Sequence, residues 1–279
     1  MPTFPSAIVN DLTVQPYEVC KTFLALKPHK ATGPDNAPSR ILKSFAHVLA
    51  EPVTIIFNAS LSSSVVPKIW KESNIIPIPK VQQPSNEGDT RPISLTSCLS
   101  KVFIEDFVVS GLIDDVKEKI DPYQFGCLKG LSTTYCPLDM IHSWLSHLDS
   151  PSNGKHIRVT FLHFSKAFNR IGHNFIIEKL LDLGVRRSLI PWILNFLCER
   201  RQRVKIGETV SSWLPVTAGV HQGTKLGPIR IIIMVNDLRV NTPDTKMWKF
   251  VDRLKILLRI VLLPPSQLLM ILTYGHLTI

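Results

Sequence analysis

Histidines and cysteines are the side chains of this chain that could most readily bind a transition metal, and their spacing argues against such a site. None of the five cysteines sits in a C-x-x-C pair, so neither a zinc site nor a disulfide framework is predicted. The histidine pairs His142–His147 and His163–His173 lack the i, i+4 spacing and the companion acid of a helical zinc motif. We therefore expect unligated histidines, and scattered thiols that suit a reducing setting.

Other polar side chains stand where predicted strands end. Residues 157–164 (IRVTFLHF) predict a strand whose alternation places His163 on the same face as apolar residues. Residues 249–256 (KFVDRLKI) predict two short strands around a tight turn at Asp252-Arg253. The ends of predicted strands thus carry a histidine, an aspartate and an arginine, where a Mg²⁺ site would take carboxylate oxygens.

The first half of the chain predicts helices separated by turns. Apolar residues recur at helical spacing over residues 16–26, 40–62, 95–119 and 138–148. A turn-rich loop centred on Gly33-Pro34-Asp35-Asn36 follows the first of these segments. Residues 73–80 (SNIIPIPK) predict a short extended segment, and its two prolines forbid a central helix or a central strand.

The second half predicts strands mixed with helices. Residues 174–185 predict a helix with Gly184 as its C-cap, and residues 202–220 predict a hairpin with a glycine at its turn. Residues 227–238 predict a buried helix or strand, which Arg230 interrupts. A buried guanidinium without a partner would cost several kcal/mol. Because strands and helices do not alternate as in βαβ units, the predicted fold class is α+β.

Composition and charge indicate a globular protein with a polyanionic partner. The chain has 279 residues, of which 44% are hydrophobic and 19% charged. Its 32 Lys and Arg against 22 Asp and Glu give a net charge of +10, which favours nucleic acid first and anionic membrane second. No secretory signal is visible, and the apolar stretch 254–279 is too interrupted for a spanning helix. We expect an intracellular protein, in cytoplasm or nucleus, without a membrane partner.

Six segments occur in an order that a known family shares. They are WKESNIIPIPK, RPISLTSCLSKVF, DPYQFGCLKGLSTTY, FLHFSKAFNRIGH, VTAGVHQGTKLGP with IIIMVNDL, and KFVDRLKI. Over residues 20–256 the chain resembles the reverse transcriptase domain of non-long-terminal-repeat retrotransposons, the jockey-like elements of animal genomes. The resemblance implies a right-hand polymerase with fingers over residues 20–150 and, over residues 151–256, a palm of antiparallel sheet and packed helices. Residues 1–19 would be a lead-in, and residues 257–279 a truncated tail with the thumb missing.

The resemblance also implies a site for two Mg²⁺ ions, which clamp the attacking and leaving oxygens of an in-line displacement. In the family one Asp ends a palm strand and two more sit side by side at a hairpin turn. The matching positions here are His163, Asp252 and Arg253, so that Asp252 alone is retained as a metal ligand. Imidazole is a poor Mg²⁺ ligand and arginine repels a cation; Asn169 also stands where relatives usually carry Asp. We expect this copy to be catalytically inactive or nearly so.

Further positions match the family's contacts with nucleotide and template. The resemblance assigns Arg91 to the triphosphate of the incoming nucleotide, and Lys80 is a second candidate that reads equally well as a solvated surface charge. Phe168 matches the aromatic residue that crowds the sugar, although a core phenylalanine would look the same. The remaining matches are Gln222 and Gly223 in a nucleotide-contacting loop, and Lys129 and Gly130 in a template-contacting segment.

Three functions are compatible with these observations. The resemblance implies an RNA-directed DNA polymerase whose partners are an RNA template, an RNA/DNA hybrid and deoxynucleotides. A basic fingers and palm could instead bind nucleic acid without chemistry, with an affinity that falls steeply with salt. The third hypothesis is a transposon-derived product with no present function. The sequence does not predict an oligomeric state.

Overall fold

The computed structural model describes residues 12–126, 128, 130–132, 134–149, 157–164, 172–216, 226–240, 245–250, 253–258 and 272–277. The chain divides into two compact units, each assembled from two separate stretches. The first unit comprises Met1–Glu118 and Gly172–Gly227, and the second comprises Lys119–Ile171 and Pro228–Ile279. The predicted division into lead-in, fingers, palm and tail was based on the family resemblance and not on compactness, and it stays a prediction.

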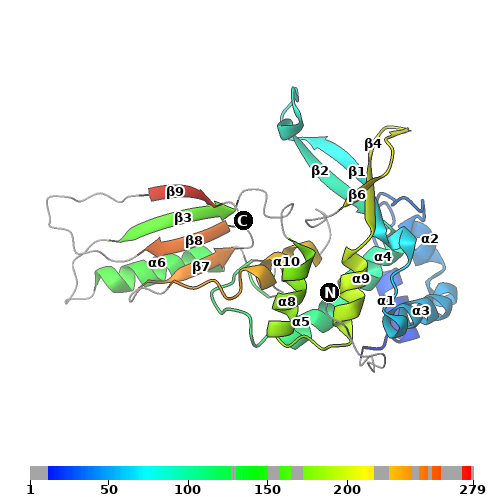
Figure 1. The fold of residues 1–279 in the computed structure, drawn as a ribbon, viewed down its shortest axis with the longest axis horizontal. Helices are drawn as coiled ribbons and strands as arrows, with labels where there is room; N and C mark the ends of the chain where they lie inside the picture. Colours follow the sequence, from blue (N-terminus) through cyan, green and yellow to red (C-terminus); the bar gives the residue numbers. More distant parts are fainter. Residues whose placement is uncertain are drawn as a thin grey trace. The chain divides into compact units, whose positions relative to one another are not determined.

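The first unit is mostly helical and carries one sheet (Figure 1). Its helices are α1 (Pro16–Leu24), α2 (Ser39–Ser44), α3 (Ala46–Ser63), α4 (Cys98–Val102), α5 (Val109–Val116), α8 (His173–Asp182) and α9 (Leu189–Leu197), together with the short helices η1 (Lys68–Lys71) and η2 (Glu87–Asp89) and the π-helix η3 (Phe103–Val108). Its strands are β1 (Glu72–Pro79), β2 (Thr90–Thr96), β4 (Arg200–Ile206), β5 (Thr209–Val210) and β6 (Leu214–Val216). The helices predicted over residues 16–26, 40–62 and 174–185 are confirmed, and the helical segment predicted from residue 95 begins at Cys98, after β2.

The ends of these helices follow from local sequence. Helix α1 starts with Pro16, and the backbone N–H of Gln15 donates to Oε2 of Glu18 over 2.9 Å, which closes the first turn. Helix α8 stops where the sequence predicted, because Gly184 adopts a φ of 66° just beyond its last turn. There the N–H groups of Gly184 and Val185 donate to the last carbonyls of the helix over 2.8 and 3.0 Å.

The predicted turn at residues 33–36 is confirmed, and it packs tightly on the end of β2. The N–H of Asn36 donates to the carbonyl of Gly33 over 3.1 Å, and Asn36 has a φ of 51°. A Cβ at Gly33 would lie 2.4 Å from the carbonyl carbon of Thr96 and 2.5 Å from the nitrogen of Ser97. Glycine at this position therefore allows the two backbones to meet.

Aromatic rings form the centre of the first unit. Phe57 stacks on Phe103 with 4.3 Å between ring centroids, and Trp192 meets Phe103 edge-on at 5.5 Å. Offset and edge-on contacts of this kind stabilise a core beyond the area that they bury. The Trp192 indole N–H donates to Oγ of Ser60 over 2.9 Å, so its polar atom is satisfied although the residue is fully buried.

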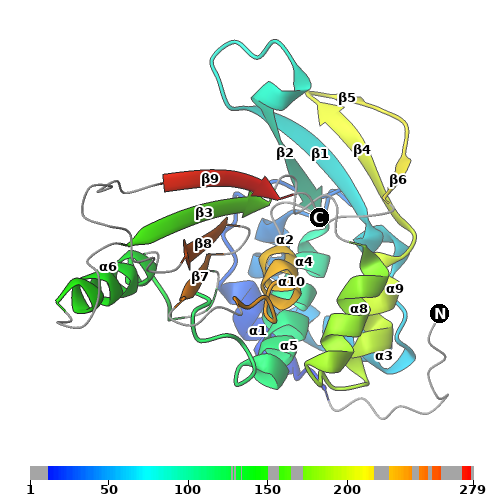
Figure 2. The ribbon, with the colours of Figure 1, turned by 60° about the vertical axis from the view of Figure 1, so that its left-hand side comes forward.

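The sheet of the first unit has the strand order β2-β1-β4-β5, and β6 also pairs with β4 (Figure 2). The prediction that residues 73–80 could not form a central strand is wrong. Strand β1 pairs with β2 along its length and in parallel with β4 through Glu72–Ile75. Pro77 and Pro79 lie beyond that parallel pairing, where β1 has β2 alone beside it, so their missing N–H groups interrupt no bond to β4.

The second unit is a sheet with helix α6 packed beside β7 (Figure 1). Its elements are α6 (Tyr135–Leu148), β3 (Arg158–Phe164), β7 (Met247–Phe250), β8 (Arg253–Leu258) and β9 (Leu272–Leu277), in the strand order β7-β8-β3-β9. The strand predicted over residues 157–164, the helix over 138–148 and the strand pair over 249–256 are confirmed. A buried cluster of Cys136, Met140, Val159 and Trp248 joins the helix to the sheet, and the Trp248 indole donates to Oδ2 of Asp139 over 2.6 Å.

Residues 227–238, predicted as a buried helix or strand, form helix α10 (Leu226–Met234), which starts at the boundary of the two units. Arg230 is buried as predicted, at 3% exposure, and loss of solvation lowers its pKa to about 10. Among the described helices, none is both long and apolar enough to cross a membrane.

Candidate nucleic-acid interface and metal positions

Strand alternation gathers four cations on one face of the first unit's sheet. Arg201, Arg203 and Lys205 are two residues apart along β4 and therefore share a face. The pairing of β1 with β4 sets Asn74 beside Arg203, and the pairing of β1 with β2 sets Ile78 beside Arg91. Directly paired residues share a face, as do residues an even number apart along one strand. The four cations Arg91, Arg201, Arg203 and Lys205 are called the basic face below.

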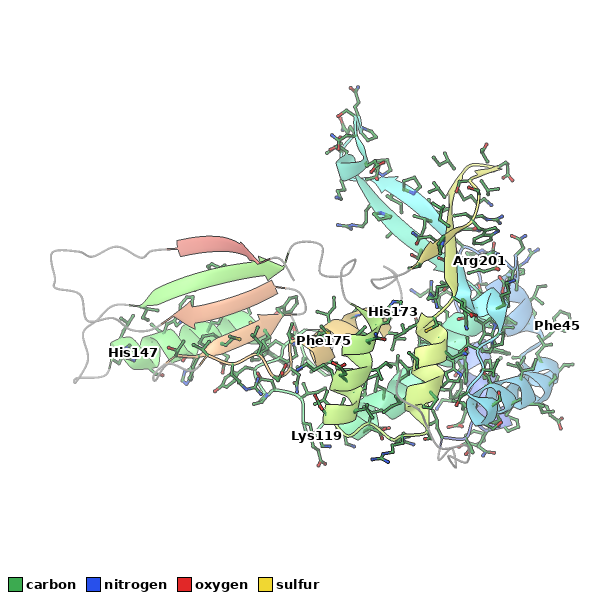
Figure 3. All side chains as sticks on the ribbon, in the orientation of Figure 1. Phe45, Lys119, His147, His173, Phe175 and Arg201 are labelled. Atoms are coloured by element: carbon green, nitrogen blue, oxygen red, sulfur yellow. The ribbon has the colours of Figure 1, made fainter. Side chains whose placement is uncertain are left out.

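Two of these cations are held in place by neighbours on β1. Arg201 forms an ion pair with Glu72, and Nε of Arg203 donates to Oδ1 of Asn74 over 2.8 Å. Both guanidinium groups also lie near the ring of Trp213, at 5.2 Å for Arg201 and 4.5 Å for Arg203 from its centroid. Figure 3 shows Arg201 on β4 beside the base of β1 and β2. The arrangement is preorganised, because each guanidinium has a fixed partner.

On β2 the basic face is more open to solvent than the opposite face, whereas on β4 the opposite face, with Val204 and Ile206, is the more exposed. Ile93 and Leu95 share the face of Arg91 and are half-buried, whereas Ser94 and Thr96 point the other way and are buried. Apolar residues toward solvent and hydroxyls toward the interior reverse the usual pattern of a surface strand. A surface that combines accessible apolar groups with cations suits a partner that has both phosphates and flat rings.

Arg91 and Lys80, the predicted triphosphate cations, both lie on the β1–β2 hairpin and are exposed. Nζ of Lys80 donates to the carbonyl of Gly88 over 2.9 Å, so its ammonium is directed to the loop that joins the two strands. In that loop the Asp89 carboxylate accepts from Ser85 and Asn86, and these bonds lower the pKa of Asp89. Arg91 thus belongs to the basic face, and Lys80 braces the tip of the hairpin.

Two of the three predicted metal-ligand positions are paired across the second unit's sheet. His163 lies opposite Arg253 in the antiparallel pairing of β3 with β8. Asp252 lies outside the described residues, and Arg253, which was predicted in the turn, is instead the first residue of β8. Within the part of the chain that the structure describes, no group of three or more His, Cys, Asp or Glu could hold a metal ion.

Most other predicted contacts lie outside the described residues. These are Lys129, Phe168, Asn169, Gln222 and Gly223. Gly130 is described and has a φ of 85°, a left-handed conformation that favours glycine. The histidines of the weaker metal pairs occupy ordinary helical positions, with His142 and His147 on α6 and His173 at the first residue of α8. None of the four described cysteines forms a disulfide bond.

A buried polar network in the second unit escaped the sequence reasoning. Lys249 is fully buried on β7, and its Nζ pairs with Oδ2 of Asp121 at 2.7 Å and donates to the carbonyl of Asn236 over 2.9 Å. Arg239 reaches the same Asp121 oxygen at 2.6 Å. Burial lowers the pKa of Lys249, while the Asp121 carboxylate acts in the opposite direction. The network ties β7 to two segments that are far from it in sequence.

Backbone bonds reinforce this network. The N–H of Lys249 donates to the carbonyl of Tyr123, and the N–H of Phe125 donates to the carbonyl of Lys249, both over 2.9 Å. The Asn236 side chain accepts from the N–H of Asp121 over 2.8 Å and donates to the carbonyl of Lys119 over 2.9 Å. Strand β7 ends two residues before Asp252, the predicted metal ligand, which lies outside the described residues. A lysine three residues before that aspartate was the available signal, since it interrupts an otherwise buried strand.

Comparison with known proteins places these features in one family. The family described as reverse transcriptase (RNA-dependent DNA polymerase) matches residues 78–259. Two curated relatives from Drosophila melanogaster are 29% identical to the chain. They are the RNA-directed DNA polymerase from mobile element jockey, matched over 235 residues or 82% of this chain, and the probable RNA-directed DNA polymerase from transposon BS, matched over 251 residues or 86%. The chain spans 25% and 26% of the length of these relatives.

A solved structure supports the same fold. Telomerase from Candida tropicalis, in complex with a fragment of telomeric RNA, superposes with a TM-score of 0.51. The superposition covers 76% of this chain and 40% of that one, at 13% sequence identity. At this identity the likeness concerns the fold, and it agrees with the predicted mixture of helices and sheets in fingers and palm.

Proposed function

Because the chain belongs to the reverse transcriptase family of RNA-directed DNA polymerases, as its motifs predicted, we propose that it retains nucleic-acid binding and has lost polymerase chemistry. The basic face carries the binding part of this proposal. It presents Arg91, Arg203 and Lys205 on one side of a sheet, with no carboxylate of the described residues paired to them. The proposed partners are an RNA template and an RNA/DNA hybrid, in the cytoplasm or the nucleus.

The loss of chemistry rests on the residues at the metal positions. A two-metal site supplies Mg²⁺ ions that stabilise the attacking and leaving oxygens, and it takes carboxylate ligands. Here a histidine and an arginine occupy the paired positions 163 and 253. Their donor set does not fit Mg²⁺, because imidazole is a poor ligand for a hard cation and a guanidinium has no lone pair to offer. No polymerase step is therefore assigned to this chain.

The remaining family positions keep their proposed roles in binding. Arg91 would contact phosphates of a nucleotide or template strand, since its planar guanidinium suits bidentate recognition of phosphate. Lys80 is a weaker candidate, because its ammonium already donates a hydrogen bond to the carbonyl of Gly88. Phe168, Gln222 and Gly223 are proposed around a nucleotide, and Lys129 and Gly130 along a template.

A binding titration tests the first half of the proposal. The full chain is titrated against a fluorescent RNA oligonucleotide at several salt concentrations, with anisotropy as the readout. Each phosphate contact contributes a slope of about −0.7 in log K against log salt for a single strand, so the three cations Arg91, Arg203 and Lys205 give about −2. Absence of binding at low salt would contradict the proposal and favour a product with no present function.

A primer-extension assay tests the second half. The chain is incubated with an RNA template, a DNA primer and deoxynucleotides in Mg²⁺ and separately in Mn²⁺. We expect no extension in either metal while the primer–template remains bound. Extension by the unaltered chain would show that the two substitutions do not abolish catalysis, and the protein would then be an active polymerase.

A further inference from the structure

Trp213 is a large aromatic side chain that is not part of a core. Of the five tryptophans, Trp70, Trp192 and Trp248 are buried at 3% exposure or less, and Trp144 packs against the core cluster of the second unit. Trp213 instead lies half-buried between β5 and β6, with Ser212 and Leu214 exposed on either side. Leu214 pairs with Gln202, which lies on the face opposite to Arg201 and Arg203. Because side chains alternate along an extended chain, Trp213 lies on the basic face.

The ring of Trp213 is oriented by two anchored cations. Arg203 lies 4.5 Å from the ring centroid and is held by Asn74, and Arg201 lies 5.2 Å away and is held by Glu72. Two fixed guanidinium groups restrict the rotation of the indole, so little conformational entropy is lost when another flat group stacks there. The site therefore combines a π-surface with positive charge that lies over the ring.

The geometry of β4 favours one strand of nucleic acid over a duplex. Arg201, Arg203 and Lys205 succeed one another at about 7 Å along a single straight line. A line of cations follows one sugar–phosphate backbone, and an aromatic ring beside it can stack on a base that is not enclosed in base pairs. A duplex would present its phosphates to the cations but would keep its base faces covered.

We propose that Trp213 is a stacking subsite for an unpaired base of single-stranded nucleic acid, whose backbone is held by Arg203 and Lys205, while Arg201, paired with Glu72, orients the ring. This inference rests on the proposed nucleic-acid binding and narrows it to a substrate class. Every base has a π-face, so the subsite is tolerant of sequence. RNA and DNA single strands share this chemistry, and the experiment below separates them.

The test compares the unaltered chain with Trp213→Leu, which removes the π-surface, and Trp213→Phe, which keeps a smaller one. Each is titrated by fluorescence anisotropy with a uridine-rich RNA, a thymidine-rich DNA and a blunt RNA duplex at one fixed salt concentration. Trp213→Leu is expected to weaken single-strand binding about 5- to 100-fold and duplex binding less than about twofold. Trp213→Phe is expected to keep most of the affinity. Tyr17→Leu, at a 70% exposed aromatic on α1, is the matched control and should change neither.

The outcomes separate this inference from the proposed function. If the unaltered chain binds no oligonucleotide at low salt, both fail. If it binds but Trp213→Leu and Trp213→Phe leave single-strand affinity unchanged, the stacking subsite alone is wrong. Equal losses for single strand and duplex would likewise overturn it, since Trp213 would then act by holding the arginines. Loss on RNA, on DNA or on both supports the subsite and identifies its substrate. Should Trp213→Leu fail to fold, the change of indole emission on binding, present in the unaltered chain and absent in Trp213→Phe, decides the same question.

Discussion

His163 and Arg253 face each other across the antiparallel pair of β3 and β8. Directly opposed residues in such a pair have Cα atoms about 5 Å apart, so the two positions proposed as substituted metal ligands are neighbours in space. We expect the double variant His163→Asp, Arg253→Asp to show primer extension in Mn²⁺ or Mg²⁺ that the unaltered chain lacks. Extension that is equal in both proteins would contradict the assigned cause of inactivity.

The basic face should account for the salt dependence of binding. Replacing Arg203 and Lys205 together by glutamine removes two phosphate contacts, so the slope of log K against log salt should become shallower by about 1.4. Anisotropy titrations at four salt concentrations measure this slope. The control is Lys21→Gln, an exposed lysine on α1 that lies away from the sheet strands in sequence, and its slope should match that of the unaltered chain. Equal slopes in all three proteins would place the phosphate contacts elsewhere.

The buried pair of Asp121 and Lys249 should matter far more than an exposed one. Asp121→Ala leaves the Lys249 ammonium buried without its carboxylate, and we expect the free energy of unfolding to fall by about 3–5 kcal/mol. Adding Lys249→Met should recover part of this loss. Asp114→Ala, which breaks an exposed pair with Lys117, should cost less than about 1 kcal/mol. Urea denaturation measures all three, and similar losses for Asp121→Ala and Asp114→Ala would argue against a structural role for the network.

Gly33 should not tolerate even one added carbon. The new Cβ of Gly33→Ala would meet backbone atoms of Thr96 and Ser97 at about 2.5 Å or less, and backbone cannot turn aside as a flexible side chain can. We expect a loss of about 1–3 kcal/mol in the free energy of unfolding. Gly172→Ala is the matched control, because its Cβ meets nothing within 4 Å and its φ of −68° suits any residue. Thermal melts that show equal losses for the two variants would contradict the close approach.

Arg230 should be a source of instability. Its pKa falls to about 10 in the folded chain, well below its ordinary value, so the unfolded state binds more protons between about pH 10 and the ordinary pKa of arginine. Stability contributed at this position therefore rises with pH through that window. Arg230→Met removes the buried charge and should raise the free energy of unfolding at neutral pH by about 1–4 kcal/mol. Its advantage over the unaltered chain should be constant below about pH 10 and shrink as the pH rises above that value, and a difference that stays constant above pH 10 would mean that desolvation is not the cause.

Local sequence patterns predicted helices and strands well where the periodicity within a single segment determines its secondary structure. The apolar spacing of residues 16–26 and the alternation of residues 157–164 were sufficient, and Gly184 marked its helix end. The prolines of residues 73–80 led to a wrong prediction. A proline excludes a central strand only where a second strand pairs with its own part of β1, and the sequence does not show where that second strand lies. That second strand is β4, whose Arg201 contacts Glu72 across 129 positions of sequence.

The candidate site also contains residues that a local motif predicts and residues that only the pairing of strands brings together. Arg91 was identified through a family motif, but Arg201, Arg203 and Lys205 were not, since only the pairing of β4 with β1 shows that they share its face. The Asp121–Lys249 pair was hidden for the same reason. Charged residues at distant positions look like solvated surface charges until the pairing of strands sets them side by side.

The discontinuous make-up of the first unit has a consequence for synthesis on the ribosome. Residues 119–171, which belong to the second unit, are made before the stretch that supplies α8, α9 and β4. Strand β1 is synthesised early and can at first pair only with β2. The parallel strand β4, which pairs with its other edge, follows more than a hundred residues later. Contacts of such long sequence separation form late and slowly, which leaves an unpaired edge open to other chains meanwhile. A nascent chain halted after residue 118 would therefore be a target for chaperones rather than a folded unit.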